Sequence, residues 1–115
     1  MDEPVIDPAV YAALQNAVGA EFAAELADTF LEEASSMLAD LRSARSESNA
    51  ERFRRAAHSL KSNSSTFGAA RLAALARELE LKGLDADPTR DVNALTSLDA
   101  ECARAAAALK DLSHG

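Results

Sequence analysis

The sequence predicts an all-α fold, an antiparallel up-down four-helix bundle with a short additional N-terminal helix. Alanine and leucine dominate, and only 4 glycines and 3 prolines interrupt the 115 residues. Aromatic residues make up 4% of the chain and tryptophan is absent, so the core must consist mainly of leucine, alanine and a few phenylalanines. Such a composition is typical of helices that pack closely through small side chains. The length suits a single domain that spans residues 1–115.

The first two helices are predicted at Pro8–Val18 and 20–44. Asp7 followed by Pro8 is a start signal, because aspartate caps a helix and proline fits its first position. Gly19 separates the two helices. In the second helix, apolar residues recur at spacings of three, four or seven and predict a buried stripe, which comprises Phe22, Leu26, Phe30, Met37 and Leu41.

Three further helices are predicted, at Ala50–Thr66, Ala70–Lys82 and 88–112. Ser48 or Asn49 is expected to cap the first of them, Gly83 to end the second, and Asp87 with Pro88 to start the third. The apolar face of the last helix is expected to hold Val92, Leu95, Leu98, Cys102, Ala105 and Leu109. Because the connections are short, consecutive long helices should run antiparallel, and the short first helix should cover one end of the bundle.

Composition and charge exclude several classes of function. The net charge of −7 disfavours nucleic acid as a partner. The apolar runs fall far short of a membrane span, and the acidic N-terminus lacks the apolar segment of a signal peptide. We therefore expect no membrane association and a cytoplasmic location. Cys102 is the single cysteine, which excludes an intramolecular disulfide bond.

The charges are distributed unevenly along the chain. Residues 52–82 contain seven bases and two acids, a net charge of +5. Residues 1–51 carry a net charge of −9 and residues 83–115 a net charge of −3. The basic stretch is either a solvated surface or a docking surface for an acidic or phosphorylated partner.

His58 lies in the middle of the helix predicted at Ala50–Thr66. A helix advances about 100° per residue, so Phe53, Ala57 and Leu60 fall on the opposite half and His58 should point away from the core. Five polar residues lie within about 60° of His58 on its own side, namely Arg54, Arg55, Lys61, Ser62 and Ser65. A histidine in this setting is a nucleophile, a metal ligand, a base or an ordinary surface residue.

Three kinds of site find little support. The chain has only two histidines, no Glu-x-x-His pair, no zinc-ligand spacing and no EF-hand loop, which argues against a metal site. Ser59 and Ser62 share a straight helix with His58, where no buried acid would orient the imidazole for hydrolysis. An acyl carrier usually has Asp-Ser-Leu around its serine, whereas here His58 precedes Ser59.

A longer motif around His58 indicates a family. The segment 57–69, AHSLKSNSSTFGA, followed by Leu72, Leu75 and Leu79-Glu80, closely resembles the signature of histidine-containing phosphotransfer (HPt) domains. The family pattern runs Ala-His-Ser/Thr-Leu-Lys-Gly, then small residues, an apolar residue, Gly-Ala, and a leucine-spaced helix that ends in Leu-Glu. The motif covers about 25 residues, and the five-helix plan extends the similarity over nearly the whole chain.

The resemblance implies that His58 carries a phosphoryl group between receiver domains of response regulators or hybrid histidine kinases. Lys61 matches the family's lysine near the phosphoryl site, and Gly68 matches the glycine of the following turn. The resemblance also implies no cofactor on this chain, since the receiver supplies Mg²⁺, and no autokinase or hydrolase activity. We expect a monomer.

The surface around His58 is expected to receive the partner and to comprise Arg54, Arg55, Ser62, Ser65 and Gly68. Ser62 departs from the commoner glycine of the family pattern, but serine is still small enough to allow a partner to approach. The basic stretch would suit the acidic active site of a receiver. The alternative is a non-catalytic helical-bundle interaction module that binds a receiver or kinase without carrying phosphate.

Overall fold

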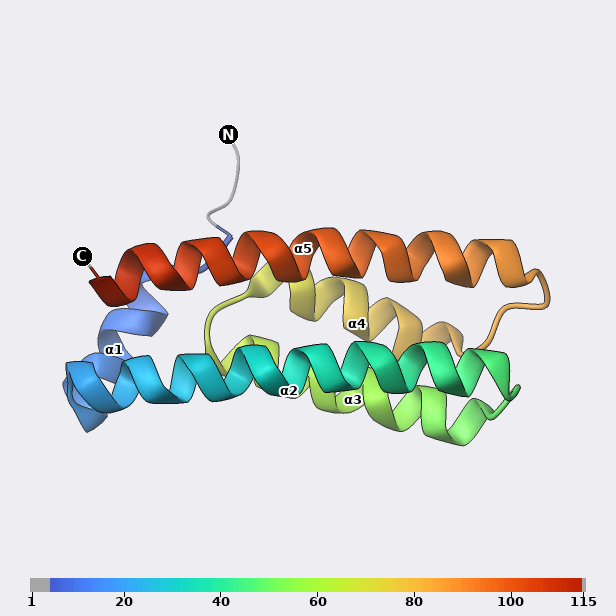
Figure 1. The fold of residues 1–115 in the computed structure, drawn as a ribbon, viewed down its shortest axis with the longest axis horizontal. Coiled ribbons are helices and arrows are strands. Elements are labelled where there is room, and N and C mark those ends of the chain that lie inside the picture. Colours follow the sequence, from blue (N-terminus) through green and yellow to red (C-terminus); the bar gives the residue numbers. More distant parts are fainter. Residues whose placement is uncertain (1–4, 115) are drawn as a thin grey trace.

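The computed structural model describes residues 5–114 and contains five helices and no strand within this range (Figure 1). The helices are α1 (Pro8–Val18), α2 (Ala20–Ser46), α3 (Ala50–Thr66), α4 (Ala70–Lys82) and α5 (Pro88–His114). The all-α prediction is confirmed, and α1, α3 and α4 begin and end where the sequence predicts. The second and fifth helices each run two residues beyond their predicted ends. Residues 1–4, the first part of the acidic N-terminus that is expected to contain no signal peptide, lie outside the described range.

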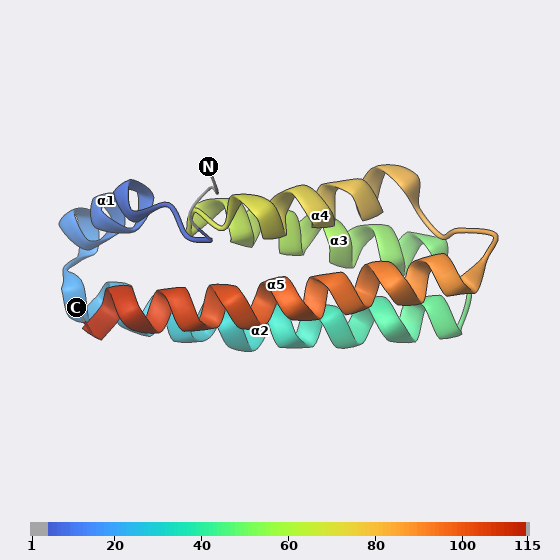
Figure 2. The ribbon, with the colours of Figure 1, turned by 90° about the horizontal axis from the view of Figure 1, so that it is seen from above.

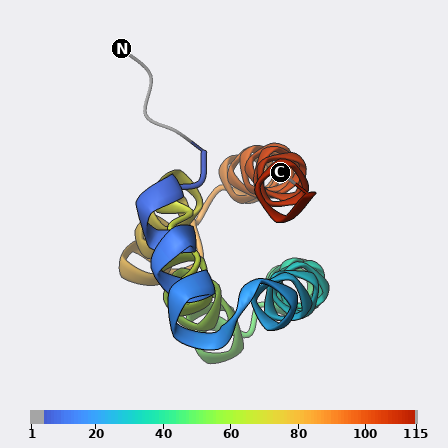
Figure 3. The ribbon, with the colours of Figure 1, turned by 90° about the vertical axis from the view of Figure 1, so that its left-hand side faces the viewer.

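Helices α2 to α5 lie side by side, and each runs opposite to the preceding one (Figure 1). Each packs against the next, and α5 also packs against α2, so that the four surround a common core (Figure 3). Helices α2 and α5 have 27 residues each, whereas α3 has 17 and α4 has 13. The shorter pair leaves space beside one end of the longer pair, and α1 occupies it (Figure 2).

Side-chain caps explain where three of the helices begin. Asp7 accepts a hydrogen bond from the Ala9 amide at 2.9 Å, and Asn49 accepts one from the Arg52 amide at 3.1 Å. Asn49, rather than Ser48, is therefore the cap of α3. Asp87 repeats the arrangement at α5, where its carboxylate accepts the Thr89 amide at 3.0 Å.

The core consists of leucine, alanine and a few aromatic residues, as the composition predicts. Phe30 of α2 stacks on Phe67 at the end of α3, with 4.8 Å between ring centroids. The buried stripe of α2 differs from the predicted one in its first turns, because Ala23 and Ala27 face the core and Phe22 is 50% exposed. The remaining buried residues of this helix are Phe30, Ala34, Leu38, Leu41 and Ala44.

Val92 was also predicted to be buried, and it is instead 56% exposed. Its neighbour Asp91 takes the inward position, where its carboxylate accepts hydrogen bonds from Arg45 Nη1 and the Asp85 amide, each at 3.0 Å. These hydrogen bonds of Asp91 thus determine which side of the first turn of α5 faces the core. Farther along the same helix, four apolar residues are buried as predicted, namely Leu95, Leu98, Ala105 and Leu109.

The turn between α3 and α4 depends on Gly68, which has φ = 74°. Its carbonyl accepts a hydrogen bond from the Asp7 amide at 2.9 Å, which ties the start of α1 to this turn. A Cβ at this position would lie 2.9 Å from Cβ of Val10. Gly68 is therefore buried under α1, and its predicted place on a partner surface is wrong.

No helix in the described range is both long and apolar enough to cross a membrane.

Candidate functional site

His58 projects from the middle of α3 toward the last turns of α4, with 58% of its side chain exposed. The residues that fix this orientation lie on the other side of α3, where Phe53, Ala57 and Leu60 are fully buried in the core. The helical prediction that His58 points away from the core is therefore confirmed. The exposed ring is held by one neighbour, from a different helix.

That neighbour is Glu80 of α4, whose carboxylate binds two groups of α3 at once. Its Oε2 lies 2.5 Å from Nδ1 of His58, and its Oε1 accepts a hydrogen bond from Nζ of Lys61 at 2.7 Å. The Glu80 side chain is only 19% exposed, so the carboxylate sits in the seam between the helices. The structure thus brings together His58, Lys61 and a third residue to which the sequence had assigned no role.

Lys61 and His58 together lower the pKa of Glu80, and the hydrogen bond from Lys61 is the larger cause. The carboxylate consequently remains ionised at neutral pH and can only accept hydrogen bonds. Nδ1 of His58 must then carry the proton in this contact. In the neutral imidazole this leaves Nε2 with a free lone pair.

The arrangement can support nucleophilic chemistry at Nε2. The Nδ1 hydrogen bond fixes both the tautomer and the orientation of the ring, as an orienting group does for other activated nucleophiles. A positive charge that develops on the ring would be stabilised by the Glu80 carboxylate. The ring is exposed, so a reacting group on another protein can approach it.

The predicted polar neighbours of His58 have different environments. Ser62 and Ser65 are exposed on the same side of α3. Arg54 and Arg55 are also exposed, but Arg55 forms an ion pair with Glu51 at 2.6 Å. For Arg54 no ion pair is present among residues 5–114.

The predicted basic stretch is largely neutralised by acids from neighbouring segments. Arg52 pairs with Asp40 of α2 and with Glu47, at 3.0 and 2.9 Å. Lys82 pairs with Asp85 at 2.7 Å, and Arg71 approaches Glu101 of α5 at 3.8 Å. The net charge counted along the sequence therefore overstates the free positive charge around His58.

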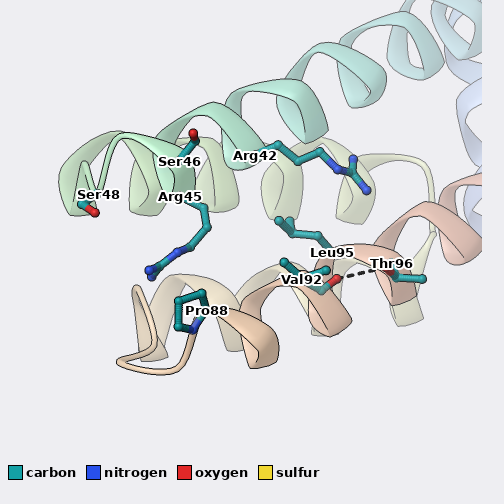
Figure 4. A pocket seen from close by; sticks show the side chains of 8 residues that line it. All are labelled: Arg42, Arg45, Ser46, Ser48, Pro88, Val92, Leu95 and Thr96. Carbon is teal, nitrogen blue, oxygen red and sulfur yellow. Dashed lines mark hydrogen bonds between the residues drawn. The ribbon is translucent and has the colours of Figure 1, made fainter.

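A hollow of about 470 Å³ at the end of α2 and the start of α5 is a competing candidate (Figure 4). Val92, Leu95 and Pro88 line it together with two arginines. Both arginines are already engaged, Arg42 with Asp99 and Arg45 with Asp91. Because these cations have partners and no histidine lies among the lining residues, this hollow does not match the chemistry at His58. Residues 5–114 also contain no cluster of three metal-ligating side chains.

Comparison with known proteins agrees with the site. The family model of the Hpt domain matches residues 25–112. A comparison with curated proteins gives no match. Among solved structures, the chain is similar to the crystal structure of histidine-containing phosphotransfer protein B (HptB) from Pseudomonas aeruginosa PAO1, with a TM-score of 0.85 and 27% sequence identity over 98% of this chain and 97% of that chain. The chain belongs to the Hpt domain family, the phosphotransfer carriers of two-component signalling.

Proposed function

We propose that His58 accepts a phosphoryl group on Nε2 from a receiver-domain aspartate and passes it to another receiver. The observation that carries this proposal is the contact between Nδ1 and Glu80, because in the neutral imidazole it leaves the Nε2 lone pair free on a side chain that is 58% exposed. Phosphoryl transfer requires positioning and charge neutralisation more than acid–base groups. A single oriented imidazole on a stable helix meets that requirement.

The proposed step needs no proton transfer. The Nε2 lone pair attacks the phosphorus of an aspartyl phosphate, an N–P bond forms, and the P–O bond breaks with its electron pair leaving on the aspartate carboxylate. The ring keeps its Nδ1 proton and becomes cationic beside the Glu80 carboxylate, which stabilises it. Transfer to the next receiver is the same step in reverse.

Lys61 is proposed to stabilise the phosphoryl group once it is attached. Before phosphorylation, the ammonium group of Lys61 donates a hydrogen bond to Glu80. Lys61 lies one helical turn from His58, and its flexible side chain allows the ammonium group to move toward the negatively charged phosphoryl group. We propose that the chain itself holds no cofactor and that the receiver supplies Mg²⁺. Autokinase and hydrolase activities are not expected.

We propose that residues 1–115 form one domain, an up-down four-helix bundle with α1 as an additional N-terminal helix. Its role is to hold α3 and α4 in a fixed register, so that Glu80 meets His58. We further propose that the protein acts as a cytoplasmic monomer whose partners are receiver domains, not nucleic acid or membranes.

Incubation with receiver domains charged by acetyl phosphate tests the proposal. We expect an acid-labile, alkali-stable label on the wild-type chain, as for phosphohistidine. His58→Gln should abolish labelling with an unchanged circular dichroism spectrum and melting temperature, because the side chain is exposed. Labelling of this variant would overturn the assignment. A wild-type chain that binds receivers but is never labelled would instead indicate a non-catalytic interaction module.

A further inference from the structure

The two nitrogens of the His58 ring face different surroundings. Nδ1 is turned toward α4, because it contacts Glu80 of that helix. One ring carbon separates the two nitrogens of an imidazole, so that bonds made at Nδ1 and at Nε2 point in widely divergent directions. Nε2 is also the nitrogen that is not bonded to the carbon nearest the backbone. It is therefore directed away from α4 and outward from α3.

Contacts of other residues on α3 identify the two sides of this helix. Lys61 contacts Glu80 of α4 and lies about 60° from His58 around the helix axis. Asn63 contacts Glu33 of α2 and lies about 140° from His58 in the opposite sense. Residues that are rotated from His58 in the sense of Asn63 thus lie on the side of Nε2.

Arg55 is a cation on the Nε2 side. It precedes His58 by three residues, a spacing that places the two Cβ atoms about 5–6 Å apart on the helix surface. Arg55 is rotated about 60° from His58 toward Asn63, whereas Arg54 is rotated about 40° toward Lys61. The side chain of Arg55 is 75% exposed, so its guanidinium group can change partners without disturbing the core.

The present partner of Arg55 is an exposed carboxylate that another anion can replace. Nη2 of Arg55 donates a hydrogen bond to Oε1 of Glu51 at 2.6 Å, four residues earlier in the same helix. Both side chains are largely exposed, and ion pairs of this kind contribute little to stability. A phosphoryl group offers about two negative charges and three acceptor oxygens, so it competes well with a single carboxylate.

We propose that Arg55 leaves Glu51 and binds the phosphoryl group when His58 is phosphorylated. This inference rests on the proposed function and adds a second cation to it. Lys61 approaches the phosphoryl group from the α4 side, and Arg55 approaches it from the α2 side. The planar guanidinium group can donate two hydrogen bonds to the phosphoryl oxygens. Glu51 is then the partner of Arg55 in the unphosphorylated chain only.

Arg54 provides a matched comparison, because it carries the same charge one residue earlier. It lines a hollow of about 380 Å³ on the α4 side, together with Glu80 and Lys82. Nε2 points away from this side, so Arg54 acts on a phosphoryl group only through long-range electrostatics. The two arginines therefore separate a direct contact from a general effect of positive charge.

Phosphorus nuclear magnetic resonance tests the contact without a partner protein. Phosphoramidate is a small donor that phosphorylates histidine directly, and a pH titration then gives the pKa of the phosphoryl group. A bound cation stabilises the dianion, so Arg55→Ala should raise this pKa, and Arg54→Ala should raise it by less than half as much. Labelling by phosphoramidate should slow about threefold in Arg55→Ala, as for an exposed ion pair, with partial recovery in Arg55→Lys.

Glu51 provides an independent variant. Glu51→Gln removes the competitor for Arg55 and should lower the pKa of the phosphoryl group. The same substitution in the Arg55→Ala chain should have little effect, since no guanidinium group remains to be released. Equal changes in the two backgrounds would show that Glu51 acts only through its own charge, and would overturn the exchange of partners.

The outcomes distinguish the contact from the function. The contact is overturned if the pKa of the phosphoryl group is unchanged in Arg55→Ala or is raised equally by Arg54→Ala. Slower transfer from a receiver with an unchanged phosphoryl pKa would assign Arg55 to the partner protein and overturn the contact too. A wild-type chain that phosphoramidate labels and charged receivers do not would overturn the proposed function, while Arg55 is still tested. Absence of a label from either donor overturns both.

Discussion

The carboxylates of Asp91 and Glu80 each accept hydrogen bonds from two groups, and they differ in what those groups can do. Asp91 accepts from Arg45 Nη1 and the Asp85 amide, and 1% of its side chain is exposed. Glu80 contacts His58 Nδ1 and Lys61 Nζ in a seam open to solvent. The first cluster joins α2 to the start of α5, close to the hollow in Figure 4, and the second joins α3 to α4.

The difference lies in the reactive atoms that remain. Both donors to Asp91 are permanently protonated and contain no nucleophile, so that this cluster can only stabilise the fold. Glu80 instead binds one nitrogen of an imidazole whose side chain is exposed, and the other nitrogen is not used in this contact. The buried Asp91 cluster therefore holds the helices in place. The exposed Glu80 cluster orients an imidazole ring whose second nitrogen can react.

The largest expected effect on stability comes from the buried Asp91 cluster. Asp91→Ala removes the acceptor of Arg45 and of a backbone amide, which should lower the free energy of unfolding by about 2–3 kcal/mol. Urea denaturation measures the loss. At temperatures where the variant is folded, the rate of phosphoryl transfer should equal that of the wild type. A loss below about 0.5 kcal/mol would show that the cluster does not hold α5 in place.

A change in the Glu80 cluster should instead affect the rate of phosphoryl transfer more than the stability of the fold. Glu80→Gln keeps an oxygen that can accept from Nδ1 but removes the charge that stabilises the cationic ring. Transfer should slow by about tenfold, equivalent to about 1.4 kcal/mol of activation free energy. Rapid-quench kinetics with a charged receiver measure the rate, and a rate equal to that of the wild type would remove Glu80 from the mechanism.

The pH dependence of stability provides a second test of Glu80. Its pKa in the folded protein is lowered by Lys61 and His58, so the unfolded chain binds a proton more readily at this residue. The stabilising contribution is present at neutral pH and is lost as the pH falls through the lowered pKa. The difference in unfolding free energy between the wild type and Glu80→Gln should accordingly shrink toward zero on acidification. A difference independent of pH would contradict the ion pairing.

The smallest expected effect comes from Lys61, which contacts the carboxylate and not the imidazole. Lys61→Ala should slow transfer by about fivefold, close to 1 kcal/mol, and leave the melting temperature nearly unchanged. Lys61→Arg keeps the positive charge and should recover part of the rate. Equal transfer rates in the wild type and Lys61→Ala would leave this lysine without a role.

The sequence predicted the helices well because their signals are local. Asp7, Asn49 and Gly83 act within one turn of their own helix, and so their effects could be inferred without any tertiary contact. The orientation of His58 was predictable for the same reason, since the apolar face of α3 is strongly marked.

The errors arose where another helix decides the outcome. Gly68 was expected at the surface and is covered by α1, and Phe22 was expected in the core although alanines of α2 take its place. The sequence motif contains Glu80 as part of Leu79-Glu80 but did not reveal its role. Its contact with His58 depends on how α4 is aligned along α3. Register between helices is a tertiary property that residue spacing within one helix does not contain.

The most direct test of the central claim is to identify the phosphorylated atom. Nuclear magnetic resonance of the ¹⁵N-histidine-labelled chain, phosphorylated by a charged receiver, distinguishes the two imidazole nitrogens by their coupling to phosphorus. We predict a phosphoryl group on Nε2 of His58, with the proton retained on Nδ1 facing Glu80. A phosphoryl group on Nδ1, or on a serine near His58, would contradict the account.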